Sequence, residues 1–303
     1  MTMNIGIFGG VAGTGSIDEV IADVRTAHEH GFPSYWVPQI FGWDALTLLA
    51  VVGRETEGIE LGTSVVPTYP RHPAMLAAQA LTTQAAASGR FTLGIGLSHQ
   101  PVIEHMFGMD FAKPVRHLRE YLDILMPLVS GEAVSADGET LSAHLALDIP
   151  GAQPVPVMVA ALGPQMLKLA GSRTAGTITW MTGPATISGH TKPAIDAAAD
   201  AAGNPVARIV CGLPVCVTSD VERTRERAAK VYAIYGQLPS YRAMLDREGA
   251  EGPADIAIIG DEDHAAERIS ALAAAGVTDF AASEFASSDD ERTRTRDLLR
   301  SLL

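Results

Sequence analysis

The feature that most constrains the fold is a regular alternation of short β-type segments with longer helical patterns along the 303 residues. The β-type segments are rich in β-branched and apolar residues, and helix start and stop signals lie between them. This order is typical of βα units around a parallel sheet. Eight strands are predicted, at residues 3–8, 34–37, 60–65, 91–96, 155–160, 177–180, 208–217 and 278–283.

The connections predict a single domain over residues 1–303. Ser16 with Glu19 and Ser219 with Glu222 have the spacing of capping boxes, and Asp44 is placed to cap a third helix. The alternation is interrupted after the fourth and seventh strands, but no Pro/Ser-rich linker separates two halves. We therefore predict an α/β fold, a TIM (β/α)₈ barrel with insertions after strands 4 and 7, rather than two open-sheet domains.

Charge and hydropathy narrow the class of partner. The chain has 22 Lys and Arg against 35 Asp and Glu, a net charge of −13, which disfavours nucleic acid and anionic membranes. No apolar run reaches the length of a membrane span, and we expect a cytoplasmic protein with a small-molecule substrate. Cys211 and Cys216 are five positions apart, so they are expected as reduced thiols on opposite faces of one strand. No ligand spacing predicts a metal.

In a parallel barrel the residues just past each strand converge on one face, where the active site lies. Four segments there carry chemistry: residues 61–67, 94–99, 160–166 and 180–184. Gly94 and Gly96 allow close approach of a ligand, and Gly163 precedes a helix whose N-terminus suits an anion. Trp180 and Met181 suit an apolar ring. Each segment is also compatible with plain strand exits and core packing.

Several side chains beyond these segments are candidates. Trp43 and Tyr69 follow strand ends and are expected to line an aromatic mouth or to cover the barrel top. His72 and His99 fall on the same face as proton donors or anion ligands, although His72, before Pro73, equally suits a helix cap. The other histidines in helix or hairpin patterns are expected on the surface or at caps; they are His28, His30, His117 and His144.

Together these segments resemble the luciferase-like oxidoreductases, and more closely the branch that uses the deazaflavin coenzyme F420. The resemblance covers nearly the whole chain. The motifs that carry it are Leu61-Gly62-Thr63-Ser64-Val65-Val66-Pro67 with Arg71-His72-Pro73, Gly89-Arg90-Phe91-Thr92-Leu93-Gly94-Ile95-Gly96, Ala160-Ala161-Leu162-Gly163-Pro164, and Trp180-Met181-Thr182-Gly183-Pro184.

The resemblance implies a homodimer and a non-prolyl cis peptide at Ser64-Val65, against which the deazaflavin would bend. It also implies two groups of cofactor contacts. The contacts to the ring and tail are Gln39, Ser64, Val65, Gly94, Gly96, Ser98 and His99. The backbone contacts to the phosphate are Ala160, Ala161, Leu162, Gly163 and Met166.

The sequence departs from the sugar-phosphate dehydrogenases of the same class. Those enzymes place an Asp-His pair where Gln39-Ile40 stand and a catalytic Glu where His99 stands. His99 and Trp43 therefore remain as catalytic candidates, and the predicted substrate contacts are Trp43, Tyr69, Trp180 and Met181.

The leading hypothesis is hydride transfer between C5 of F420 and a small organic substrate, in the reductive direction. The alternatives are an FMN-dependent luciferase-like monooxygenase and a non-catalytic flavin-binding protein. An unrelated aldolase or lyase barrel ranks last, because no lysine at a strand end is placed for a Schiff base.

Overall fold

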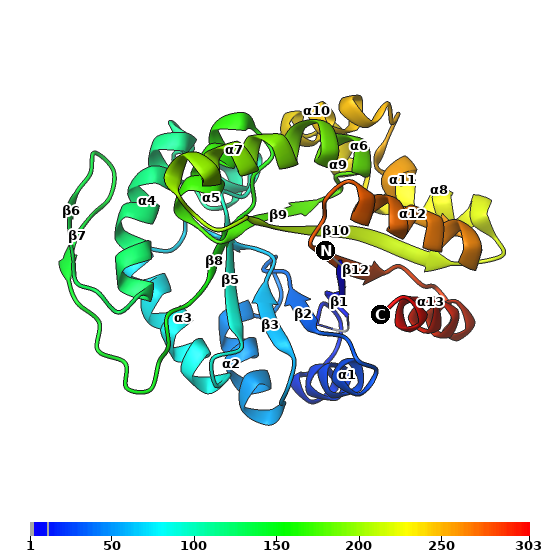
Figure 1. Ribbon diagram of the computed structural model, residues 1–303, viewed down its shortest axis with the longest axis horizontal. Helices are drawn as coiled ribbons and strands as arrows, with labels where there is room; N and C mark the ends of the chain where they lie inside the picture. Colours follow the sequence, from blue (N-terminus) through cyan, green and yellow to red (C-terminus); the bar gives the residue numbers. More distant parts are fainter. Residues whose placement is uncertain (1–2, 11) are drawn as a thin grey trace.

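Eight parallel strands close into a barrel in the computed structural model, which describes residues 3–10 and 12–303 (Figure 1). They follow one another around the barrel in chain order, and the last pairs with the first. The predicted TIM barrel is confirmed. The eight strands are β1 (Asn4–Phe8), β2 (Ser34–Val37), β3 (Glu60–Thr63), β5 (Phe91–Gly96), β8 (Val157–Val159), β9 (Gly176–Trp180), β10 (Arg208–Val217) and β12 (Asp279–Glu284).

Two short strands pair with barrel strands without belonging to the ring of eight, and the sequence did not predict either. β4 (Val66–Pro67) pairs with the end of β5, and β11 (Ile258–Gly260) pairs with the end of the long strand β10. A strand of two or three residues is too short to show a period in its sequence.

Helices surround the strands, and most begin where local signals place them. The predicted capping box of Ser16 and Glu19 is present, and Asp44 caps the next helix. The box predicted at Ser219 and Glu222 is wrong: Asp220 is the N-cap, and its carboxylate accepts a hydrogen bond from the Arg223 N–H. Helices between the barrel strands, apart from those of the two insertions, are α1 (Ile17–Glu29), α2 (Ala45–Glu55), α3 (Pro73–Ala86), α5 (Pro164–Arg173), α6 (Pro184–Thr186), η2 (Ile187–Thr191), α7 (Lys192–Ala202) and α12 (Glu262–Ala274). The last helix, α13 (Asp289–Ser301), follows β12.

The two predicted insertions are present. After β5 the chain forms the π-helix η1 (Val102–Met106), α4 (Pro114–Val129), and a hairpin of β6 (Val134–Asp137) and β7 (Ser142–Leu145), which projects from one edge of the molecule in Figure 1. After β10 come α8 (Val221–Val231), α9 (Ala233–Gln237), α10 (Pro239–Glu248) and α11 (Pro253–Ile256). Across the described residues, no helix has the length and apolar character needed to cross a membrane.

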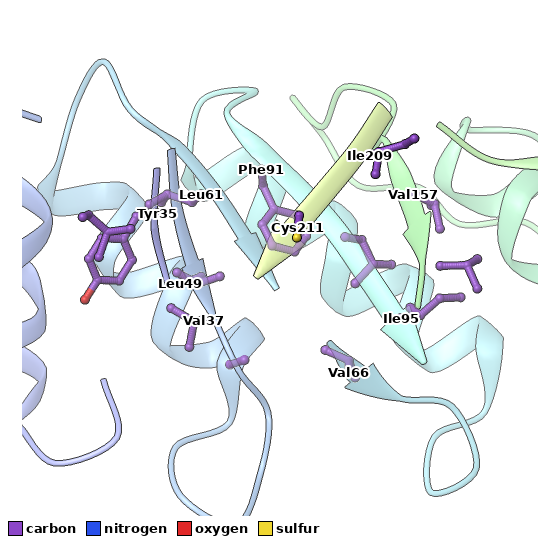
Figure 2. Packing of buried hydrophobic residues seen from close by; sticks show 14 of the residues in the cluster. Tyr35, Val37, Leu49, Leu61, Val66, Phe91, Ile95, Val157, Ile209 and Cys211 are labelled. Atoms are coloured by element: carbon purple, nitrogen blue, oxygen red, sulfur yellow. The ribbon is translucent and has the colours of Figure 1, made fainter. Parts of the chain in front are cut away.

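The hydrophobic core has two main layers. The larger one lies between the strands and the helices, and part of it is shown in Figure 2. The smaller one fills the barrel interior with Trp36, Met158, Ile178, Val210 and Ala281, against which Phe8 and Val65 pack. Phe8 is the last residue of β1 and Val65 comes shortly after the end of β3, so both side chains cover the barrel interior at its carboxyl end.

Cys211 and Cys216 are free and buried in different clusters, which confirms their placement on opposite faces of β10. Burial raises the pKa of each thiol to about 12. Both therefore stay protonated at neutral pH and behave as small apolar side chains.

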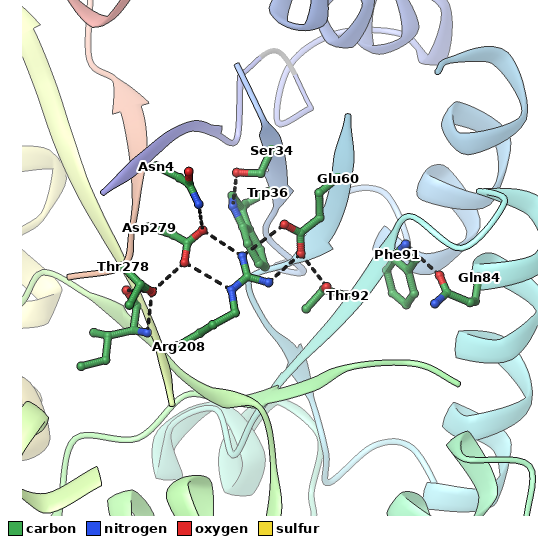
Figure 3. A network of polar contacts seen from close by, with 11 residues as sticks. Asn4, Ser34, Trp36, Glu60, Gln84, Phe91, Thr92, Arg208, Thr278 and Asp279 are labelled. Carbon is green, nitrogen blue, oxygen red and sulfur yellow. Dashed lines mark hydrogen bonds and ion pairs between the residues drawn. The ribbon is translucent and has the colours of Figure 1, made fainter. Parts of the chain in front are cut away.

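A polar network closes the amino end of the barrel (Figure 3). Arg208, at the start of β10, donates to both carboxylate oxygens of Glu60, at 2.9 and 3.1 Å, and to both of Asp279, at 3.2 and 2.9 Å. Thr92 donates to Glu60 at 2.6 Å, and Asn4 donates to Asp279 at 3.2 Å. The network ties together β1, β3, β5, β10 and β12 at the face opposite the strand carboxyl ends, where a structural role is expected.

Candidate active site

The predicted cis peptide is present at Ser64-Val65, directly after β3. Val65 lies close to the ends of two neighbouring strands, since a Cβ added to Gly96 would be 2.6 Å from Val65 Cγ2 and 3.2 Å from Ala160 Cβ. Ser98, two residues after the end of β5, has a left-handed backbone conformation with a φ of 62°. The structure thus brings Val65, Gly96 and Ala160 together at the carboxyl face, and their contact with a cofactor stays a prediction.

Gly94 has a packing role inside the barrel wall. A Cβ at this position would overlap the Thr63 carbonyl oxygen. The Thr63 hydroxyl accepts a hydrogen bond from the Gly94 N–H and donates one to the Gly94 carbonyl, both at 2.9 Å. A glycine is therefore required here to let β5 approach the end of β3, whatever binds above it.

The N-terminus of α5 is open. Gly163 is its N-cap, Pro164 follows without an N–H, and in the described part of the chain no side chain caps this helix. A Cβ added to Gly163 would meet nothing within 4 Å. The first-turn N–H groups, including those of Gln165 and Met166, are free to bind an anion, which the helix dipole favours.

The neighbouring helix start at Gly183-Pro184 has the same sequence pattern but is filled. The Glu248 carboxylate, from the end of α10, accepts hydrogen bonds from the Ala185 and Thr186 N–H groups of α6. Of these two glycine-proline turns, only the one at Gly163 can take an anion from outside. The sequence could not separate them, because Glu248 lies more than sixty positions from Ala185.

His190 holds the open turn in place. Its Nε2 donates to the Leu162 carbonyl oxygen at 2.8 Å from the π-helix η2. This bond fixes the residue just before Gly163, so the backbone of the turn is held by the next helical segment. His190 is not among the residues predicted from the sequence, because it is 28 positions from its partner and no local pattern links the two.

Aromatic side chains line one side of the carboxyl face. Trp180 stacks on Phe8 with centroids 4.9 Å apart and contacts Tyr235 edge-on at 6.2 Å. Tyr235 contacts Tyr241 at 4.9 Å, and Tyr241 contacts His99 at 5.7 Å. The insertion after β10 thereby joins the end of β9 to the end of β5.

Burial lowers the pKa of His99 below its usual 6.5, so its imidazole is neutral near pH 7.

A second aromatic stack lies after β4. Tyr69 lies between Phe111 and His117, with centroid distances of 5.0 and 3.9 Å. His117 is buried, and its Nε2 is 3.0 Å from the Thr68 hydroxyl. Burial lowers the pKa of His117 to about 4. The prediction of a surface or capping role for His117 is wrong, because it shares the buried face of α4 with Tyr121, one turn later.

The remaining predicted residues help to hold the loops. Gln39 Oε1 accepts from the Ala45 N–H at 2.7 Å, and Trp43 Nε1 donates to the Gly15 carbonyl at 3.1 Å. His72 caps α3, accepting from the Ala74 N–H at 3.3 Å. Met181 is buried in the outer core layer. Cofactor or substrate contacts by Gln39, Trp43 and Met181 stay predictions.

These features define a TIM-barrel protein whose candidate site, at the strand carboxyl ends, combines an anion-competent turn with the cluster of Val65, Gly96 and Ala160. A family model described as luciferase-like monooxygenase matches residues 3–286. The chain belongs to this family and is a luciferase-like oxidoreductase.

Known proteins of two cofactor classes resemble the chain. A Mycobacterium tuberculosis protein with the provisional name coenzyme F420-dependent oxidoreductase is 27% identical, with 84% of this chain and 87% of the relative covered. The coenzyme F420-dependent tetrahydromethanopterin reductase of Methanopyrus kandleri superposes with a TM-score of 0.83 at 20% identity, covering 100% and 99% of the two chains. The oxygenating constituent of 3,6-diketocamphane monooxygenase of Pseudomonas putida, in complex with FMN, gives 0.75 at 18% identity, covering 99% and 96%.

Proposed function

We propose that the protein is a coenzyme F420-dependent oxidoreductase that transfers a hydride between C5 of the deazaflavin and a small organic substrate, in the reductive direction. The observation that carries the proposal is the open α5 N-terminus at Gly163, on the same face as the cluster of Val65, Gly96 and Ala160. The sequence relative from Mycobacterium tuberculosis supports F420 over FMN.

The residues present fit such a cofactor. The backbone of Ala160 to Gly163 and the N–H of Met166 would hold the phosphate, because this helix start lacks an internal cap. Val65, Gly96 and Ser98 would border the ring. When bound, the deazaflavin supplies the carbon that carries the hydride. The protein would orient the substrate over that carbon and move one proton.

His99 would move that proton. It lies just past β5, next to Tyr241, and its lowered pKa makes the neutral imidazole the main form at pH 7. The neutral form accepts a proton when a hydroxyl is oxidised, and the imidazolium returns it when a carbonyl is reduced.

The pH dependence follows from this assignment. Because the pKa of His99 lies below 6.5, turnover in the reductive direction should rise as the pH falls toward that pKa, while oxidation should fall over the same range. His99→Gln should remove this pH dependence and lower kcat by about 100-fold with little change in F420 affinity. Steady-state rates between pH 5 and 8 in both directions measure this; an unchanged profile in the variant would assign the proton to another group.

Binding titrations decide between the cofactors. Each cofactor is titrated with the protein, and the quenching of its own fluorescence gives its affinity. Binding of F420 should be at least tenfold tighter than binding of FMN. Tight FMN binding with oxygen consumption in the presence of a reductant would instead establish a monooxygenase. Binding of either cofactor without turnover of any substrate would support a non-catalytic flavin-binding protein.

A further inference from the structure

We propose that the substrate site takes an uncharged, mainly apolar molecule with one hydrogen-bond-accepting oxygen, held between an apolar rim and the Tyr69 hydroxyl. The proposal rests on the proposed function, since it concerns what would bind beside the cofactor.

The apolar rim consists of large side chains on the loops that follow β2 and β5. Phe41 and Phe107 join the two loops, with ring centroids 6.4 Å apart. Contiguous exposed apolar side chains at the end of a barrel mark a binding surface. The members of the apolar rim, between 38% and 66% exposed, are Ile40, Phe41, Trp43, Met106, Phe107 and Met109.

Tyr69 packs against the chain segment that continues from the apolar rim. The segment that carries Phe107 and Met109 continues to Phe111, whose ring stacks on Tyr69. His117 packs on Tyr69 as well, so the phenol is held in one orientation. Its hydroxyl is buried and has no hydrogen-bond partner among the described residues. A buried hydroxyl without a partner is costly, and a substrate oxygen would relieve that cost.

The charges around the apolar rim disfavour an anionic substrate. Every Arg and Lys of the described loops 68–72 and 99–116 already has a carboxylate partner, in the pairs Arg71–Asp44, Lys113–Glu139 and Arg116–Glu139. Glu104 and Asp110 add negative charge to the loop after β5. Lys113 and Arg116 share the one carboxylate of Glu139, but with Asp44, Glu104 and Asp110 the acidic groups still outnumber the basic ones. This excess of negative charge would weaken the binding of a substrate that carries a phosphate or carboxylate. The open turn at Gly163 would be used by the cofactor.

Two ketones of equal length test the substrate class. Calorimetric titration of the F420-loaded protein should give at least tenfold tighter binding of 2-heptanone than of 6-oxoheptanoate, which differs by a terminal carboxylate. Failure of F420 to bind would overturn the proposed function itself. Binding of F420 with equal or tighter binding of 6-oxoheptanoate, or with no binding of 2-heptanone, would overturn only the substrate class.

Substitutions locate the binding surface. Phe107→Asp and Met106→Asp should each weaken 2-heptanone binding about tenfold, and Tyr69→Phe about threefold, all with unchanged F420 affinity. Val206→Asp is the matched control, because Val206 is 65% exposed, as Met106 is at 66%, but lies beside β10's amino end. If the Asp variants alter only the oligomeric state in sedimentation experiments and leave ketone binding unchanged, a second copy of the chain covers the rim and the proposal is wrong.

Discussion

Replacing Arg208 with methionine is expected to lower the free energy of unfolding by about 3 to 5 kcal/mol. The guanidinium is bonded to two carboxylates at once, and the Asp279 side chain is only 4% exposed. Methionine fills a similar volume but leaves Asp279 as a buried charge without its cation. Urea unfolding at pH 7, followed by circular dichroism, measures the change.

The matched control is Arg300→Met. Arg300 pairs with Asp297 on α13, and both side chains are largely exposed, so the loss should be below about 1 kcal/mol. Should Arg208→Met fail to fold, Arg208→Lys keeps the charge but loses the bidentate geometry, and should show a smaller loss. Equal stability of the Arg208 and Arg300 variants would show that the network contributes nothing beyond an exposed pair.

Acid should weaken the same network. Burial alone would raise the pKa of Asp279, but hydrogen bonds and charge from Arg208, with Thr278 and Asn4, bring it below the usual 3.8. A carboxylate with a lowered folded-state pKa stabilises the fold above the unfolded-state pKa, and that contribution is lost as the pH falls through the folded value. The stability difference between wild type and Arg208→Met should therefore shrink below about pH 4.

The barrel could be predicted because its signals are local. The β-type segments and the caps at Ser16 and Asp44 depend on residues a few positions apart, and β10 begins and ends as predicted. Local signals failed where neighbouring groups decide which of two adjacent residues caps a helix. Asp220 rather than Ser219 caps α8, with its own N–H bonded to the Thr218 hydroxyl.

The position of the candidate site could be predicted from the sequence, but the residues that hold it in place could not. Strand ends place Val65, His99 and Gly163 on one face, because parallel strands all end there. His190 and Glu248 decide which helix start is held open and which is filled, yet each acts across a long sequence separation. The Arg208–Glu60 pair spans 148 positions, so its only sequence trace is a charged residue at the start of each strand.

A carboxylate placed at the open turn should abolish the high affinity for F420. In Gly163→Asp the new side chain enters space where a Cβ meets nothing within 4 Å, and the backbone φ of −82° is ordinary for aspartate. Aspartate is a favoured N-cap, so it would bind the first-turn N–H groups that the phosphate needs and would also repel the phosphate charge. Loss of two charge-assisted hydrogen bonds predicts a rise in the F420 Kd of about 100-fold or more.

Two controls test whether the loss of F420 affinity comes from the phosphate site at α5. The deazaflavin chromophore without its phosphate tail should bind wild type and Gly163→Asp within about threefold of each other, because it makes no use of the turn. Gly252→Asp makes the same change at another glycine before a proline, also an N-cap with nothing near its Cβ, and should leave F420 affinity unaltered. Since aspartate caps α5, Gly163→Asp should unfold at the same or higher urea concentration. Unchanged F420 binding in this stable variant would move the phosphate away from α5 and remove the main structural support for the cofactor assignment.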